Sequence, residues 1–269
     1  MPPTARKRTR SYDPARTRAA VLAQFDHVRA AVLGLTPEQL ALPTRLGAWT
    51  VRELAAHITM AVRSVTRGVA APAPATRDLA LHQWPPATRR FAADVDHDTR
   101  EIAEAAADGP EALAALYEET RRQLAEALAD TPDERLITTR FGGVRLGDFL
   151  VTRTVELTVH TDDLNAATGL EIPYDRQALA ACVRLLADTL ALSAPGGSVE
   201  VRIPPFAVVQ CVEGPRHTRG TPPNVVETDP LTWVRLATGR TEWGAALAEA
   251  RVRASGERAD LSARLPLLG

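Results

Sequence analysis

The sequence predicts a helical bundle followed by a small mixed α+β domain, and three observations support that fold class. Residues 13–170 contain four long segments in which apolar side chains recur every three or four positions. After Gly169 the pattern changes to one helical segment and then to short runs of alternating apolar and polar residues. Proline and glycine residues separate these segments. We therefore expect a four-helix bundle over residues 13–170 and an α+β domain over residues 172–269.

The first two bundle helices have clear start signals. Asp13, which is followed by a proline, is typical of a helix N-cap, and it predicts a helix over residues 14–34. Thr50 and Glu53 match a capping box, which predicts a second helix over residues 51–69.

Four further segments complete the bundle region. Residues 86–107 carry a thin apolar stripe on a highly charged segment, which predicts a helix lying over the bundle. After a break at Gly109-Pro110, residues 113–128 have the pattern of a third bundle helix. Residues 138–147 predict a tight loop or small hairpin, and the fourth bundle helix follows over residues 146–169.

The segment after residue 172 mixes helical and strand patterns. The expected elements, in order, are a helix over 175–192, strands over 198–203 and 206–212, a helix from Asp229 to Gly239, a strand near 252–254 and a short helix over 258–265. Residues 214–224 are too irregular for either state. His217 and Arg219 in that loop suit an anionic ligand, and a solvated turn is an equally good interpretation.

The amino-acid composition argues against several classes of function. The net charge of −1 gives no field that would attract nucleic acid or an anionic membrane, so we expect neither partner. The basic run in residues 1–12 is typical of a solvated, flexible tail. Two cysteines make no disulfide framework, and no signal peptide is apparent. We expect a cytoplasmic protein, either a monomer or a homodimer.

The fourth predicted helix contains the ionisable residues that indicate a metal site. At helical spacing Arg153, Glu156, His160 and Asp163 share one stripe, which leucines flank on one side and valines on the other. The opposite face is rich in threonine and is expected to face solvent. A solvated polar stripe is the alternative, but a buried carboxylate beside a buried imidazole is costly without a compensating charge. A divalent cation supplies that charge.

His57 is the third candidate ligand. Alone on the second helix it is a packed core histidine, but beside a buried Glu156/His160 pair it fills the next coordination position. Asp163, Arg153 and Glu53 are expected around the ligands, with Asp163 orienting His160.

Two motifs resemble a known family. The runs GAWTVRELAAH (Gly47 to His57) and RTVELTVHTDDL (Arg153 to Leu164) resemble the mycothiol-dependent maleylpyruvate isomerase branch of the DinB-like superfamily. The run HTRGTPPNVVETDPLTWVRLATG (His217 to Gly239) resembles the sterol-carrier-like domain that accompanies it. The resemblance implies a DinB-like bundle in which His57, Glu156 and His160 hold zinc and the open position takes the thiol of mycothiol. Arg219 is then the first candidate for a residue that binds the substrate or the thiol, with His217, Arg89 and Arg90 as lesser candidates.

The expected chemistry follows from three protein ligands and an open position. Such a metal lowers the pKa of bound water to roughly 7 and deprotonates a thiol. Our hypothesis is that the thiolate attacks an electrophilic carbon of a small substrate. Addition to a conjugated cis alkene, rotation and elimination would give an isomerase, whereas retention of the adduct would give an S-transferase.

Several alternatives stay open at this stage. Two histidines and a carboxylate also suit non-haem Fe(II). A zinc-dependent hydrolase would use the same ligands, and a carrier of small molecules or lipids would use the C-terminal domain as its pocket, with a merely structural metal. The choice between an enzyme and a binding protein is therefore not decided by the sequence.

Overall fold

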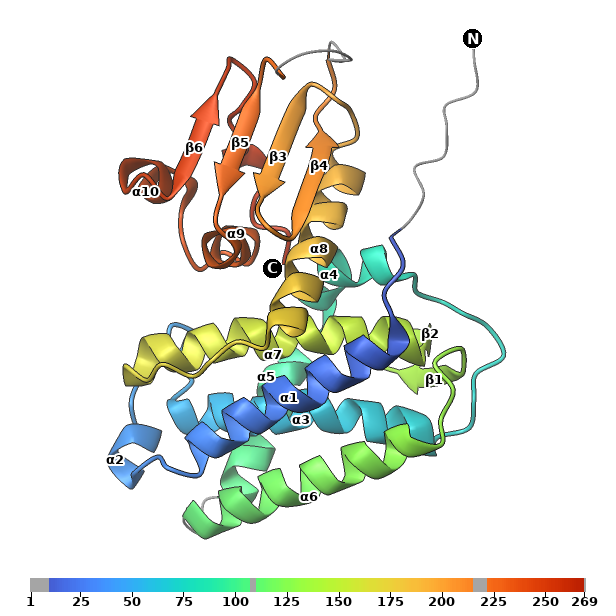
Figure 1. Ribbon diagram of the computed structural model, residues 1–269. Coiled ribbons are helices and arrows are strands. Elements are labelled where there is room, and N and C mark those ends of the chain that lie inside the picture. The colour runs from blue at the N-terminus through green and yellow to red at the C-terminus, as the bar shows by residue number, and fades with distance from the viewer. Residues whose placement is uncertain (1–9, 107–109, 215–221, 269) are drawn as a thin grey trace.

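The computed structural model describes residues 10–106, 110–214 and 222–268. It places a bundle of long helices beside a four-stranded sheet, as the sequence predicts (Figure 1). The four bundle helices are α1 (Pro14–Val32), α3 (Val51–Ala70), α6 (Pro110–Ala129) and α7 (Leu146–Thr168). Within the described part of the chain, every helix is too short or too polar to cross a lipid bilayer.

The predicted start signals are confirmed by the backbone contacts. The Asp13 carboxylate accepts a hydrogen bond from the Arg16 amide at 2.9 Å, which caps α1. The Thr50 amide donates to Glu53 Oε2 at 2.7 Å, which closes the capping box of α3. A short helix, α2 (Pro37–Leu40), lies between them and has a capping box of its own.

The single helix predicted over residues 86–107 is confirmed only in part. The helix α5 (Ala92–Ala105) lies within that range, whereas the residues before it form η2 (Thr88–Phe91), which follows α4 (Trp84–Ala87) and η1 (Leu81–Gln83). The break lies at Phe91, whose φ of −114° and ψ of 10° are not helical. The Phe91 ring packs edge-on against Phe141 at 5.0 Å between centroids, so a tertiary contact accompanies the interruption.

The predicted hairpin is confirmed. Strands β1 (Leu136–Thr139) and β2 (Gly142–Arg145) pair in antiparallel register and lead directly into α7. Gly143 permits a close approach to the neighbouring loop, because a Cβ there would lie 2.0 Å from the Thr76 carbonyl oxygen.

The C-terminal part is a mixed sheet with helices. Its strands follow the order β4-β3-β5-β6, in which β3 and β5 are parallel and the other pairs antiparallel. The elements are α8 (Arg176–Ser193), β3 (Val199–Ile203), β4 (Ala207–Cys211), β5 (Val225–Thr228), α9 (Pro230–Ala237), α10 (Trp243–Ala248), β6 (Val252–Ser255) and η3 (Ser262–Arg264). Strand β5 and helix α10 were not predicted, and the helix expected over residues 258–265 is only the short turn η3.

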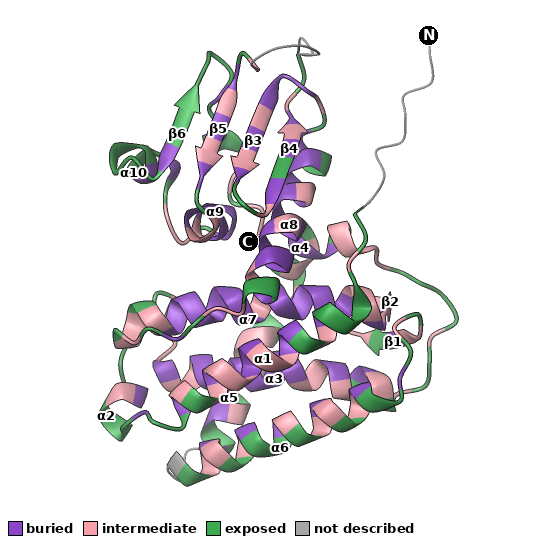
Figure 2. Ribbon diagram, in the orientation of Figure 1, coloured by how far each residue is buried: buried purple, intermediate pink, exposed green. Residues whose placement is uncertain are grey.

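Helix α7 lies at the centre of the molecule and is buried almost throughout (Figure 2). Its leucines join the core of the bundle, whereas its valines join the core shared with α8 and the sheet. The threonine face predicted to meet solvent is buried instead, because α1 and α8 both pack against this helix. Thr154 and Thr161 satisfy their hydroxyls by donating to backbone carbonyls one turn earlier in the helix.

Candidate metal centre

Two helices that are far apart in sequence bring the three predicted ligands together. Glu156 and His160 lie one turn apart on α7, and His57 lies on α3, which packs against α7. Both imidazoles are buried, with 6% and 8% of His57 and His160 exposed. Their ring centroids are 4.7 Å apart.

The spacing of the donor atoms fits a single divalent cation. His57 Nε2 lies 3.5 Å from Glu156 Oε2, and His160 Nε2 lies 3.3 Å from the same oxygen. Donor atoms of the three residues all lie within 4.8 Å of one another. Ligands held about 2.1 Å from a tetrahedral zinc ion are separated by about 3.4 Å. Two imidazole nitrogens and one carboxylate oxygen are also donors that zinc accepts.

The hydrogen bonds on the outer ring nitrogens orient both imidazoles. His160 Nδ1 lies 2.9 Å from Asp163 Oδ2, and His57 Nδ1 lies 3.3 Å from Thr99 Oγ1. An ionised carboxylate only accepts hydrogen bonds, so the proton of a neutral His160 belongs on Nδ1. Its Nε2 lone pair then faces Glu156 Oε2, which is another acceptor. Two acceptors at this separation need a proton or a cation between them.

The electrostatics of the three groups favour a charged carboxylate beside imidazoles. Burial lowers the pKa of His57, which favours the neutral ring. Burial also favours a protonated Glu156, but the hydrogen bonds with His160 and His57 outweigh it and hold its pKa well below the ordinary value. For His160 burial is outweighed by Asp163 and Glu156, so its pKa is raised. A proton on His160 therefore competes with a metal.

Arg153 supports the centre from the preceding turn of α7. Its Nη2 lies 3.6 Å from Glu156 Oε1, and its Nη1 donates to the Ala61 carbonyl at 3.0 Å. The guanidinium also lies over the Phe149 ring at 4.4 Å from the centroid. These contacts hold a buried positive charge beside the carboxylate.

The three residues line a cavity of about 600 Å³. Most of its wall is apolar or aromatic and comes from both helices, from the segment after α4, which includes Phe91, and from the hairpin, which includes Phe141. Trp49, from the loop before α3, and Leu268, near the C-terminus, also line it. The ligand atoms of the candidate centre thus face a space large enough for small molecules.

Four arginines also line the cavity, and three of them are paired with acidic side chains. Arg153 lies beside Glu156, Arg140 pairs with Asp98 at 3.0 Å, and Arg240 pairs with Asp163 at 2.9 Å. Arg67 makes no side-chain hydrogen bond or ion pair within the described part of the chain. Burial and the nearby Arg63 and Arg140 lower its pKa. An unpaired guanidinium at the wall is suited to an anionic group on a ligand.

A family model named the mycothiol maleylpyruvate isomerase N-terminal domain matches residues 10–165. The chain belongs to this family. A second model, described as a bacterial SCP ortholog, matches residues 175–267 and covers the sheet region of this family member. No curated protein matches the chain.

Two solved structures share the fold of this family member over nearly its whole length. One is a crystal structure of the mycothiol-dependent maleylpyruvate isomerase, with a TM-score of 0.60 and 16% identity, covering 96% of this chain and 97% of that chain. The other is a histidine-to-alanine mutant of the mycothiol-dependent maleylpyruvate isomerase, with a TM-score of 0.59, 17% identity and the same coverage. At these identities the likeness establishes the fold.

Several candidate residues lie away from this centre. Glu53 caps α3 through Thr50 and does not line the cavity. Arg89 and Arg90 are exposed on η2 and do not line it either. The arginines that line the cavity, Arg67, Arg140, Arg153 and Arg240, include neither of them. His217 and Arg219 lie outside the described residues.

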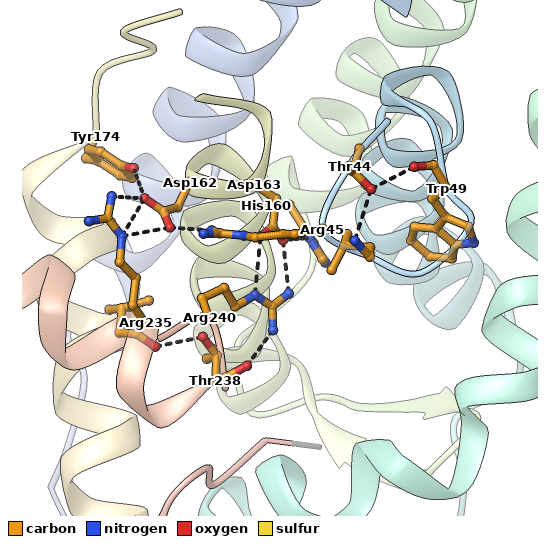
Figure 3. Close-up of polar contacts among 12 residues, drawn as sticks. Thr44, Arg45, Trp49, His160, Asp162, Asp163, Tyr174, Arg235, Thr238 and Arg240 are labelled. Carbon is orange, nitrogen blue, oxygen red and sulfur yellow. Dashed lines mark hydrogen bonds and ion pairs between the residues drawn. The ribbon is translucent and has the colours of Figure 1, made fainter. Parts of the chain in front are cut away.

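A second ionic cluster follows directly after His160 on α7 (Figure 3). Asp162 accepts hydrogen bonds from Arg235 and Tyr174, and Asp163 accepts them from Arg240. Arg45, from the loop before α3, contacts both carboxylates. Arg235 lies on α9 and Arg240 follows it, so this cluster, called here the interdomain cluster, joins the bundle to the sheet region.

Proposed function

We propose that this protein is a metal-dependent, thiol-using enzyme in which His57, Glu156 and His160 hold one divalent cation. The observation that carries the proposal is the convergence of their donor atoms, within 4.8 Å of one another, on the wall of the cavity. Three protein ligands facing open space are typical of catalytic zinc sites, whereas structural sites are closed by four. Zinc is the preferred ion, and Fe(II) suits the same donors.

A bound cation supplies Lewis acidity, which lowers the pKa of a thiol placed beside it. The sulfur must come from a cosubstrate, because Cys182 and Cys211 are both buried in the core of the sheet region. Burial also raises the pKa of the Cys182 thiol. Mycothiol is the thiol we propose, on the strength of the family to which the chain belongs.

The reaction we propose is attack of that thiolate on an electrophilic carbon of a small substrate. Elimination of the thiol after rotation about the former double bond gives an isomerase, and retention of the adduct gives an S-transferase. The related fold belongs to a maleylpyruvate isomerase, so maleylpyruvate is the first substrate to test.

The protein's own side chains have separate tasks in this proposal. Asp163 and Thr99 orient the two imidazoles through their Nδ1 atoms. The aromatic wall, including Trp49 and Phe141, reduces the access of water. Arg67 binds an anionic group of the substrate.

Cobalt substitution tests the proposal directly. We expect the Co²⁺-loaded protein to develop a sulfur-to-cobalt charge-transfer band when mycothiol is added, and to turn over maleylpyruvate only with both present. The His57→Ala variant should show neither response. A metal that binds but does not respond to thiol would favour a hydrolase, and a metal-free protein that retains lipid would favour a carrier. Either result contradicts the proposal.

A further inference from the structure

Asp163 of the interdomain cluster also contacts His160, a candidate ligand of the metal centre. Arg240 donates from Nη2 to Asp163 Oδ2 at 2.9 Å and from Nε to Asp163 Oδ1 at 3.2 Å. Asp163 Oδ2 also lies 2.9 Å from His160 Nδ1. A chain of hydrogen bonds therefore runs from the sheet region through a fully buried carboxylate to a candidate ligand (Figure 3).

We propose that Arg240 is a positioning residue of the metal centre, acting through Asp163 on His160. It fixes the plane of the Asp163 carboxylate, which in turn keeps His160 Nε2 directed at the cation. The inference rests on the proposed function, since it needs a metal at His57, Glu156 and His160. Through Arg240, the C-terminal domain contributes a residue to the metal centre.

The geometry explains why Arg240 has this effect. Its fork contacts both oxygens of Asp163, which defines the orientation of the carboxylate plane. The other arginine on Asp163, Arg45, contacts Oδ1 through Nε at 2.6 Å. Without Arg240, His160 is the partner that Oδ2 keeps, and the arginine contact of Arg45 is on Oδ1. The carboxylate plane is then less well fixed, and it can rotate more easily relative to the imidazole.

The neighbouring pair supplies a matched control. Arg235 comes from the same region and pairs with Asp162 at 2.6 Å, so it also joins the two parts of the molecule. Asp162 contacts Arg45, Arg235 and Tyr174, and none of these is a candidate ligand. A general loss of domain contact should therefore follow from either substitution, whereas loss of metal affinity should follow from only one.

The test is the Zn²⁺ affinity of the full-length protein, measured by competition with a chromophoric chelator. We expect Arg240→Gln to weaken binding roughly 10-fold and Asp163→Asn to weaken it at least as much, as is usual for the outer partners of metal-binding histidines. Arg235→Gln should stay within about 2-fold of wild type, since its partner touches no ligand. In the Asp163→Asn background, Arg240→Gln should have no further effect.

Three outcomes would overturn the inference: an unchanged affinity in Arg240→Gln, an equal loss in Arg235→Gln, or an undiminished effect of Arg240→Gln in the Asp163→Asn background. Arg240→Lys, which keeps the charge but not the fork, should be intermediate and guards against a misfolded Gln variant. Wild-type protein that takes up no His57-dependent Zn²⁺ would instead refute the proposed function, and the inference with it.

Discussion

Two ionic clusters lie within one helical turn of each other on α7, and they are built in opposite ways. In the interdomain cluster, guanidinium donors face carboxylate acceptors, so every close contact is already favourable. At the candidate metal centre, two imidazole nitrogens face a carboxylate oxygen at 3.3–3.5 Å. For a neutral His160, whose Nδ1 carries its proton toward Asp163, this is an acceptor facing an acceptor.

The comparison shows two ways in which the charge of a buried carboxylate is compensated. The protein compensates the two buried carboxylates of the interdomain cluster with its own arginines. Among the residues that the structure describes, Glu156 has Arg153 as its one arginine partner, at 3.6 Å. Its remaining demand for positive charge is met by a proton on His160 or by a metal ion.

The largest expected effect is at the centre. Replacing His57 or His160 by Ala should weaken Zn²⁺ binding by more than roughly 100-fold, because loss of a ligand exceeds the loss of an outer partner. Elemental analysis after dialysis gives the stoichiometry, and circular dichroism checks the fold. His97→Ala is the control, since His97 is an exposed histidine on α5. Full occupancy in His57→Ala would contradict the ligand assignment.

In the interdomain cluster the expected effect is on folding. Asp163→Asn should lower the free energy of unfolding by about 2 kcal/mol, because it neutralises a fully buried carboxylate that accepts charged hydrogen bonds from two partly exposed arginines. Urea unfolding of the metal-free protein measures this. Glu119→Gln, which breaks an exposed pair with Arg122, should change the stability little. Equal effects from the two substitutions would show that the interdomain cluster is unimportant for stability.

The same cluster predicts a pH dependence. Although burial opposes it, ion pairing lowers the pKa of Asp162 and Asp163 below the unfolded value of about 3.9. A depressed folded pKa contributes stability that is present above the unfolded pKa and lost as the pH falls through the folded one. The stability difference between wild type and the Asp162→Asn variant, whose partners include no histidine, should thus be constant from about pH 5 to about pH 8 and shrink below about pH 4. A difference that grows with acid would have the wrong sign.

A smaller effect is expected at the cavity wall. Arg67→Gln should raise the KM for maleylpyruvate about 10-fold with less change in kcat, because a partly exposed charged hydrogen bond to substrate is lost. Arg89→Gln should change neither constant, since Arg89 does not line the cavity. Steady-state kinetics with mycothiol would decide, and parallel effects in both variants would remove Arg67 from the site.

The smallest effect concerns the threonine face of α7. Thr158 Oγ1 is buried and has no hydrogen-bond partner among the described residues, so Thr158→Val should be neutral or stabilise by up to about 1 kcal/mol. Thr161 Oγ1 accepts from Gln24 at 2.9 Å, and Thr161→Val should cost about 1 kcal/mol. Thermal unfolding of both variants measures the contrast. Destabilisation by Thr158→Val would point to an additional partner of that hydroxyl.

The helix period was enough to predict that Glu156 and His160 share a face, because their spacing is local. His57 was predicted from its chemistry and from the resemblance, since its approach to α7 depends on how two helices pack. The threonine face was misjudged because a threonine hydroxyl can bond its own helix backbone and so be buried at little cost. Arg67 and Arg240 were not predicted, because their positions at the cavity follow from the packing of distant segments.

The most direct measurement is an anomalous diffraction map of the zinc-loaded crystal. We predict one ion about 2.0–2.2 Å from Nε2 of His57, Nε2 of His160 and a carboxylate oxygen of Glu156. An ion bound elsewhere, or no ion between these three side chains at saturating zinc, would contradict the central claim.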